Sequence, residues 1–140
     1  MHEKIPQANL TRADLEKAIE ISPYTRWVGT RLTHFEAGRV DIEVEVRKEL
    51  TQHHGFAHGA IVGYMADTAC AWAAASVVGD VVTSEYKLNL LSPAIGEKLV
   101  ARADVIKAGS RQVVVRADVF AVKDGVSKIC ATALATIARV

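Results

Sequence analysis

The chain has 140 residues, which fits one domain built around one hydrophobic core. Half of the residues are hydrophobic, 24% are charged and the formal net charge is +1, a composition typical of globular proteins. This near-neutral balance, without a cluster of basic residues, argues against a nucleic-acid-binding protein and against a strongly acidic partner.

The N-terminal twenty residues are polar and of mixed charge, and they lack the apolar stretch of a secretory signal peptide. Cys70 and Cys130 stand in apolar surroundings and share no CxxC spacing, so both are expected to be reduced, structural cysteines. These features together predict a cytoplasmic protein.

Capping signals predict a first short helix over residues 11–21. Thr11 is a candidate N-cap, and Asp14 stands at the third helical position, where an acidic side chain can complete the cap. Pro23 is expected to end this segment.

The next residues have strand character. Residues 27–35 are predicted to form a strand, and residues 36–38 a turn. Residues 39–46 alternate apolar and acidic side chains, which indicates a strand with one face on the core and one in water. Residues 58–78 are the one long helical candidate, and this helix must be covered on most sides because it is apolar almost all round.

Four further strands are predicted after the helix, separated by breaks rich in glycine and proline. They span residues 81–91, 97–107, 111–122 and 127–139, the last three as an antiparallel meander. Helices and strands do not alternate, which argues against a parallel sheet. The predicted fold class is α+β, with an antiparallel sheet wrapped around one buried helix as a single domain over residues 1–140.

The apolar run over residues 59–79 is long enough to span a membrane. It consists mostly of alanine and glycine, has no flanking Lys or Arg, and carries Asp67 near its centre. A carboxylate at that depth costs about 2.5–3.5 kcal/mol on insertion scales. A helix buried in protein is therefore favoured, and no membrane partner is expected.

A metal site is one alternative for the histidines that precede this helix. His53, His54 and His58 could supply three zinc ligands. However, the two adjacent histidines point apart on any regular element, and the H-H-x3-H spacing is not an established ligand pattern. No metal or cofactor is expected.

The segment from Gly55 to Ala60 has the pattern of a loop that enters a helix. The first backbone N–H groups of a helix have no intrahelical partner and form its positive end. The N–H of Gly59 can therefore donate to a developing oxyanion. Alternatively, Gly55 and Gly59 serve only the geometry of the turn, and the residues alone do not separate these readings.

Asp67 is the only charged residue between His58 and Asp80. An unpaired buried carboxylate is costly, so this one must be paired, open to a cavity or held partly protonated. A carboxylate in such a place suits a general base or a nucleophile. The alternative is a structural aspartate that binds a neighbouring strand.

Gly59 and Asp67 stand eight residues apart on one predicted helix, which corresponds to about 12 Å. A reacting carbonyl must lie roughly 3 Å from both its oxyanion donor and its attacking group. One helix cannot supply both groups to the same carbonyl. If both groups act, the sequence predicts a homodimer in which each site takes Gly59 from one chain and Asp67 from the other.

The spacing Q-x2-G-x2-H-G-A over residues 52–60, followed by Asp67, resembles the signature of hotdog-fold acyl-CoA thioesterases, most closely the PaaI-like phenylacetate-degradation type. The resemblance covers almost the whole chain, from ISPYTRWVGTRL before the site to SPA at residues 92–94 and the strands after it. It implies hydrolysis of acyl-CoA to a free acid and CoA by a dimer, or by a tetramer of two such dimers.

The resemblance also implies roles for single residues. Gly59 matches the oxyanion-hole glycine, and Asp67 matches the catalytic acid, acting as nucleophile or as base for water. Thr83 matches a Ser/Thr that orients this water. Gln52 stands where the family commonly has Asn and positions the thioester or its leaving group, while His58 shapes the loop and polarises the carbonyl.

Further substrate contacts are implied at Gly55 and Ala60, and at the Lys107–Arg111 hairpin beside the pantetheine arm. Ala60 replaces the second glycine of the usual His-Gly-Gly, and Gln52 is one methylene longer than Asn. Neither change removes the acid or the oxyanion donor. The alternatives are a non-catalytic acyl-CoA-binding hotdog protein and a hotdog enoyl-CoA hydratase.

Overall fold

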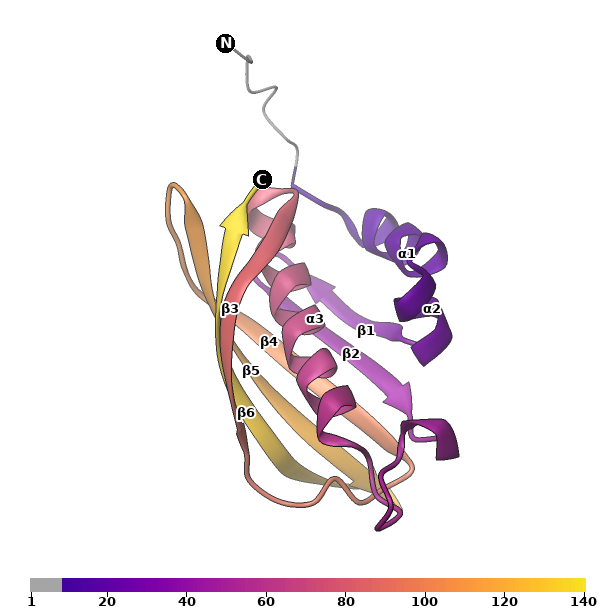
Figure 1. Ribbon diagram of the computed structural model, residues 1–140. Coiled ribbons are helices and arrows are strands. Elements are labelled where there is room, and N and C mark those ends of the chain that lie inside the picture. Colours follow the sequence, from indigo (N-terminus) through magenta and orange to yellow (C-terminus); the bar gives the residue numbers. More distant parts are fainter. Residues whose placement is uncertain (1–8) are drawn as a thin grey trace.

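The computed structural model describes residues 9–140 (Figure 1). Within these residues, six strands form one antiparallel sheet in the order β1-β2-β4-β5-β6-β3, and helix α3 lies across its concave face (Figure 1). The strands are β1 (Arg31–Glu36), β2 (Arg39–Glu45), β3 (Val81–Leu90), β4 (Lys98–Ala108), β5 (Gln112–Lys123) and β6 (Val126–Arg139). The helices are α1 (Arg12–Ile21), α2 (Pro23–Val28) and α3 (Gly59–Val78), with a short 3-10 helix η1 (Lys48–Leu50). This arrangement confirms the predicted α+β fold.

The first helix begins where its capping signals predict. The Thr11 side chain accepts a hydrogen bond from the Asp14 N–H, and the Asp14 carboxylate accepts one from the Thr11 N–H. These bonds lower the pKa of Asp14. The sequence-based prediction for residues 1–8, the absence of a signal peptide, lies outside the described residues and stays a prediction.

The prediction of a strand over residues 27–35 was wrong in its first half. Pro23 does not only end α1: it also begins α2, which runs to Val28 and ends at Gly29 in the left-handed conformation with φ 85°. Proline favours the first position of a helix, because its φ is already helical and it has no N–H to leave unpaired. The strand β1 begins only at Arg31.

Small side chains let α3 lie close to the sheet. Ala66, Ala69 and Ala73 are fully buried, and the helix contacts β2, β3, β4, β5 and β6. The inner face of the sheet offers branched side chains, such as the fully buried Val40 and Ile42 of β2. The opposite face of α3 is only partly buried.

Among the described helices, α3 alone has the length and apolar composition to cross a membrane. In this structure 67% of that apolar window is buried inside the protein. Its composition is accounted for by its place in the core.

Ser76 fastens the C-terminal part of α3 to the β1–β2 turn. Its hydroxyl donates to the Ala73 carbonyl at 2.6 Å and accepts from the Gly38 N–H at 2.8 Å. Ser76→Ala leaves that N–H without its partner, so we expect a loss of about 1–3 kcal/mol in the free energy of unfolding. Urea unfolding at one protein concentration measures this loss. Ser110→Ala, at an exposed loop residue, is the control and should change stability by less than about 0.5 kcal/mol.

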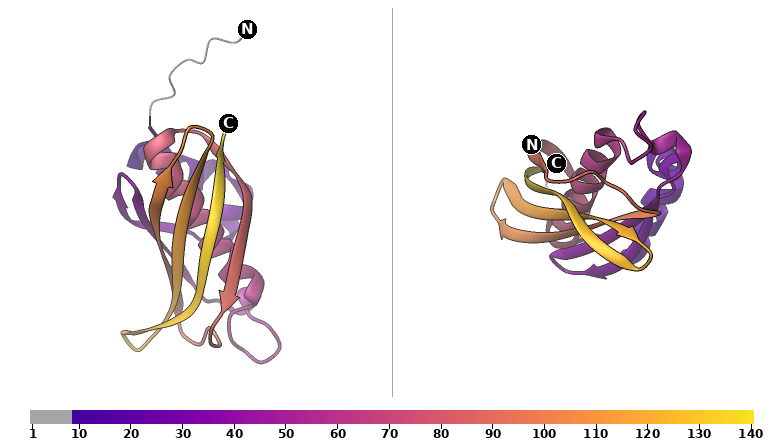
Figure 2. Two further views of the ribbon diagram at one scale, coloured as in Figure 1. Left: turned by 90° about the vertical axis from the view of Figure 1, so that its left-hand side faces the viewer. Right: turned by 90° about the horizontal axis from the view of Figure 1, so that it is seen from below.

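Strand β3 forms one edge of the sheet and pairs only with β6 (Figure 2). Its side chains Val82 and Leu90 are 58% and 61% exposed in the single chain, and Tyr86 is 40% exposed. A long, unpaired edge strand that exposes apolar side chains is a ready surface for pairing with another chain. Of the predicted catalytic residues, Thr83 lies on this strand, and Gly59 and Asp67 lie on the helix beside it.

Candidate active site

The structure brings Asp67 and Thr83 together. Asp67 lies on the partly buried face of α3, and Thr83 lies on β3 next to an irregularity in its pairing with β6. The Thr83 hydroxyl donates to Asp67 Oδ1 at 2.6 Å. No hydrogen bond from the described residues engages Oδ2, so the carboxylate is oriented through one oxygen while the other remains available for chemistry.

Within residues 9–140, one backbone N–H in the first turn of α3 has no hydrogen-bond acceptor. The Ala60 N–H donates to His58 Nδ1 at 2.9 Å, and the N–H groups of Ile61 and Val62 donate to the His58 carbonyl at 3.0 and 3.3 Å. Within residues 9–140, the Gly59 N–H has no such acceptor. The helix start therefore presents one free N–H at the residue predicted to form the oxyanion hole.

His58 is the N-cap of α3. Because its Nδ1 accepts a hydrogen bond, the neutral ring carries its proton on Nε2. The ring therefore shapes the helix start with one nitrogen and offers a donor at the other.

The loop before the helix is held by its own hydrogen bonds. Gln52 Oε1 accepts from the His54 N–H, and the Gln52 backbone exchanges hydrogen bonds with Phe56 and Gly55. Gly55 has φ 90°, a conformation that glycine adopts without strain. The amide oxygen of Gln52 is thus used by the loop, while its NH2 group remains free to act on a ligand.

The histidine pair that suggested a metal site is exposed. The rings of His53 and His54 lie with their centroids 4.1 Å apart. Among the described residues, no three His, Cys, Asp or Glu side chains are placed to hold a metal ion.

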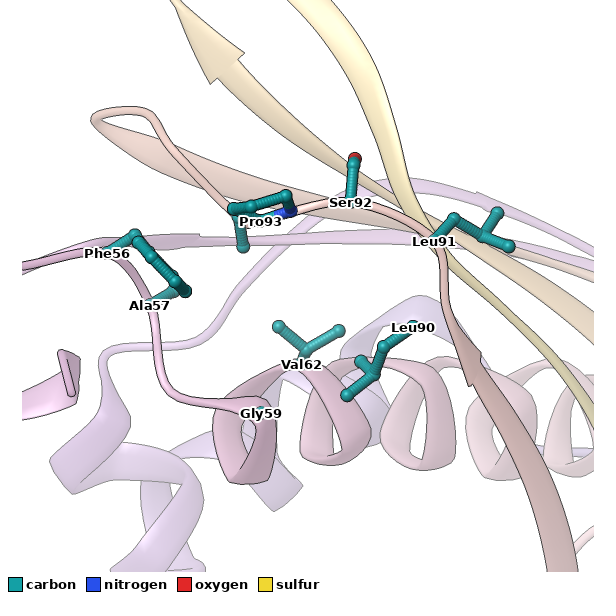
Figure 3. A pocket seen from close by; sticks show the side chains of 9 residues that line it. Phe56, Ala57, Gly59, Val62, Leu90, Leu91, Ser92 and Pro93 are labelled. Carbon is teal, nitrogen blue, oxygen red and sulfur yellow. The ribbon is translucent and has the colours of Figure 1, made fainter. Parts of the chain in front are cut away.

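A pocket of about 370 Å³ adjoins Gly59 (Figure 3). Its walls come from the first turns of α3, from the end of β3 with the loop that follows, and from the loop before α3 (Figure 3). They include Phe56, Val62, Leu90, Leu91 and Pro93. Sequence reasoning noted the SPA segment at residues 92–94 but not the two leucines before it, since nothing in an apolar strand end distinguishes a pocket wall from a core residue.

Two other predicted contacts lie elsewhere in the chain. Lys107 and Arg111 flank the β4–β5 hairpin, at the end of the sheet opposite the N-terminus of α3 (Figure 1). Within one chain they do not meet Gly59. Their predicted role beside a pantetheine arm stays a prediction, and it requires a second chain.

The cysteines fit a structural role. Both are unpaired and buried. Burial raises the pKa of Cys70 to about 12, with a further contribution from the negative charge of Asp67, and burial raises the pKa of Cys130 to about 11. Neither thiol forms a reactive thiolate at neutral pH.

Comparison with known proteins places this geometry in a family. The Thioesterase superfamily model matches residues 54–128, which include α3, Asp67 and Thr83. A thioesterase family protein from Silicibacter pomeroyi is 35% identical, with a TM-score of 0.85 over 89% of this chain and 93% of that one. The chain belongs to the thioesterase superfamily.

Two further similar proteins support this family assignment. A variant of the phenylacetic acid degradation protein PaaI from Thermus thermophilus is 27% identical, with a TM-score of 0.75 over 85% of this chain and 100% of that one. A protein from Saccharolobus solfataricus named as an esterase is 29% identical over 91% of this chain and 84% of its own length. The predicted PaaI-like hotdog thioesterase is confirmed, and the protein is a thioester hydrolase.

Proposed function

We propose that the protein hydrolyses acyl-CoA to a free carboxylic acid and CoA, at two equivalent sites between two chains. Each site takes the Gly59 N–H from one chain and the Asp67–Thr83 pair from the other. One observation carries this proposal: the free N–H and the hydrogen-bonded carboxylate lie on one unbroken helix, eight residues and therefore about 12 Å apart.

The edge strand β3 supports the two-chain arrangement. Its outer edge is unpaired in the single chain, and it carries the exposed Val82, Tyr86 and Leu90. Pairing of β3 with the same strand of a second chain satisfies its backbone groups and covers these side chains. This pairing also brings the α3 helices of the two chains to the same side of a continuous sheet, where they can share a substrate.

The chemistry follows from the charges that develop. Asp67 Oδ2 takes a proton from water, the water oxygen attacks the thioester carbonyl carbon, and the carbonyl oxygen becomes an oxyanion. The Gly59 N–H donates to that oxyanion, an interaction worth about 3 kcal/mol where one such donor has been deleted. Collapse of the intermediate breaks the C–S bond, releasing the acid and a thiolate that takes up the proton.

A second route uses Asp67 as the nucleophile. The carboxylate attacks the carbonyl carbon, the C–S bond breaks, and the resulting anhydride is then hydrolysed by water. A single turnover in 18O-labelled water tests for an anhydride opened at the aspartyl carbon. Label in the Asp67 carboxylate after the first turnover shows that opening, whereas label confined to the product acid excludes it and is the outcome expected for the general base.

Two further residues have supporting roles at the same helix start. His58 offers Nε2–H toward the carbonyl, and Gln52 offers its NH2 group toward the thioester or its leaving sulfur. Neither residue carries the reaction. The lone carboxylate and the free N–H supply the base and the oxyanion donor that thioester hydrolysis requires.

A panel of acyl thioesters tests the proposal. Acetyl-, hexanoyl-, dodecanoyl- and benzoyl-CoA are incubated with the protein, and the released thiol is measured with a chromogenic disulfide. The same acyl groups on N-acetylcysteamine show how much the CoA part contributes. We expect thiol release from at least one acyl-CoA, at a kcat/KM well above that of its N-acetylcysteamine counterpart. No thiol release from any CoA ester, or equal rates on both carriers, contradicts the CoA assignment.

A further inference from the structure

A second pocket lies on the other side of the first turn of α3, between that turn and α2. Its volume is about 240 Å³. Tyr24 and Trp27 of α2 form one wall, and His58, Ala60 and Ile61 at the helix start form the other. We call this space the α2 pocket.

We infer that the α2 pocket receives the acyl group of the substrate and that Trp27 limits the length of that group; this rests on the proposed function. A thioester carbonyl bound at the Gly59 N–H has two substituents, the acyl chain and the sulfur with its pantetheine arm. The helix start has two pockets, one bordered by Gly59 itself and one bordered by its neighbours His58 and Ala60. Each substituent therefore has a space of its own.

The aromatic wall of the α2 pocket is fixed in place from inside the fold. The Tyr24 ring packs edge-on against Tyr64 of α3, with the ring centroids 5.2 Å apart and an interplanar angle of 69°. The Tyr64 hydroxyl is hydrogen-bonded to the buried Thr30 at 2.7 Å. Tyr24 is 52% exposed and yet held on the core helix, so the wall is ordered before any ligand binds.

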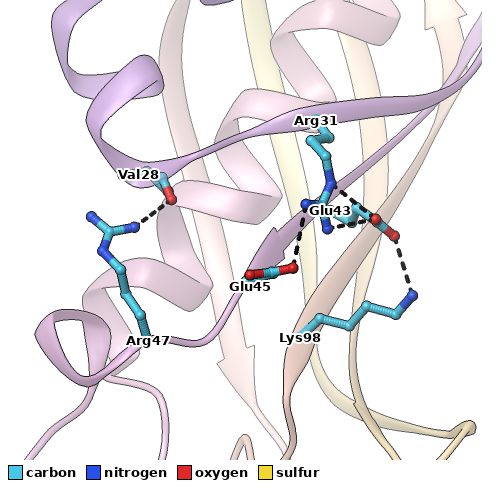
Figure 4. Close-up of polar contacts among 6 residues, drawn as sticks. All are labelled: Val28, Arg31, Glu43, Glu45, Arg47 and Lys98. Carbon is cyan, nitrogen blue, oxygen red and sulfur yellow. Dashed lines mark hydrogen bonds and ion pairs between the residues drawn. The ribbon is translucent and has the colours of Figure 1, made fainter.

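Arg47 holds the other half of this wall. Its guanidinium lies over the Trp27 ring, 4.6 Å from the ring centroid. The same group donates to the Trp27 carbonyl at 2.6 Å and to the Val28 carbonyl at 2.8 Å, the latter drawn in Figure 4. An arginine fixed by two backbone carbonyls keeps the indole across the pocket, although Trp27 is 55% exposed.

Size and lining decide which substituent enters which pocket. The carboxylate of Glu49, which lines the α2 pocket, is ion-paired with Arg47 at 3.6 Å. The rest of the lining includes the apolar side chains of Tyr24, Trp27 and Ile61, which suit an acyl chain. The pocket beside Gly59 is the larger of the two, at about 370 Å³, which suits the longer pantetheine arm. A space of about 240 Å³ lies below the usual range of ligand pockets, about 300–1,000 Å³, which suits a compact apolar acyl group.

The test is the chain-length profile of Trp27→Ala. For the wild type, kcat/KM is expected to be lower with dodecanoyl-CoA than with hexanoyl-CoA, because the indole blocks the longer chain. Removal of the ring opens the pocket, and the ratio of dodecanoyl to hexanoyl kcat/KM should rise about tenfold, since each newly buried methylene strengthens binding several-fold. Arg47→Met, which frees the indole, should move the profile in the same direction by a smaller amount.

Phe120→Ala is the matched control. Phe120 also lies beneath an arginine, Arg102, at 5.3 Å, but on strands β5 and β4 of the sheet, away from α2. Its chain-length profile should stay that of the wild type. If Trp27→Ala lowers kcat/KM equally for all chain lengths, the α2 pocket holds the arm and the inference is overturned. An unchanged profile overturns it as well.

A binding measurement separates this inference from the proposed function. Trp27 and Trp72 are the only two tryptophans, so in Trp72→Phe the fluorescence reports Trp27 alone. S-hexyl-CoA, a thioether that cannot be hydrolysed, should change this emission in a saturable way, and CoA alone should not. If calorimetry shows that S-hexyl-CoA binds but the Trp27 emission does not change, the pocket assignment is refuted while the proposed function stands. Absence of both binding and turnover refutes both.

Discussion

Asp67→Asn is expected to lower kcat for thioester hydrolysis by about 10³-fold, within the range of 10²–10⁴ typical of a general base. Asparagine keeps the size of the side chain, and its amide oxygen can still accept the hydrogen bond that Thr83 donates at 2.6 Å. The amide cannot take a proton from water, and it cannot attack a carbonyl carbon. The variant should therefore fold and bind substrate while losing the chemical step.

Steady-state kinetics with the best acyl-CoA, together with the urea midpoint of each variant, measure this effect. Asp104→Asn is the control, because Asp104 is exposed on β4 and should keep wild-type kinetics. Wild-type hydrolysis by Asp67→Asn would refute the role of this carboxylate.

Thr83→Val should lower kcat about tenfold or more, and Thr83→Ser should restore it, because the serine hydroxyl can make the same hydrogen bond.

Patterns of hydrophobicity predicted most of the fold. Each strand of the sheet buries mainly one face, and the central helix is buried on nearly every side, so both leave a clear pattern in the sequence. The alternation in β2 and the long apolar run of α3 both survive in the structure with their ends shifted by one residue. Helix α2 was missed because it is only six residues long and Pro23 can end one helix and begin the next. Because that short helix supplies Trp27, the α2 pocket was missed together with it.

The proposed catalytic residues were predictable to different degrees. Asp67 was identifiable as the one charge in an apolar helix, and Gly59 as a glycine at a helix start. The contact between Asp67 and Thr83 joins residues 16 positions apart through the packing of β3 on α3, which no local pattern specifies. It was expected only from the resemblance to the thioesterases. The two pockets combine residues from several elements, so they needed the tertiary structure.

Gly59→Pro is expected to lower kcat/KM by about 10²–10³-fold, the loss that follows deletion of one oxyanion-hole donor. Gly59 is the first residue of α3, where proline is favoured, and its N–H makes no hydrogen bond within the described residues. His58 has φ −65° and ψ 141°, a conformation that suits a residue before proline. The substitution thus removes the proposed oxyanion donor and leaves the helix intact.

Gly59→Ala provides the matched comparison because it keeps the N–H. A Cβ at this position would lie 3.5 Å from Leu90 Cδ1, an ordinary contact, so the alanine variant should fold. Its kcat/KM should exceed that of Gly59→Pro by at least about tenfold. Equal activities of the two variants, with equal stabilities, would show that the N–H has no role in the reaction.

Mixing the two inactive variants decides whether the site is shared between chains. A heterodimer of Asp67→Asn and Gly59→Pro contains one site with both groups intact, so a fully exchanged equimolar mixture should recover about one quarter of the wild-type activity. The reverse experiment mixes wild-type chains with chains that carry both substitutions. Each site of that heterodimer lacks one group, so a fully exchanged equimolar mixture should have about one quarter of the activity of wild type at the same total chain concentration, rather than one half. Failure to complement after confirmed subunit exchange, with one half of that wild-type activity in the reverse mixture, would place Gly59 and Asp67 in sites that one chain completes alone.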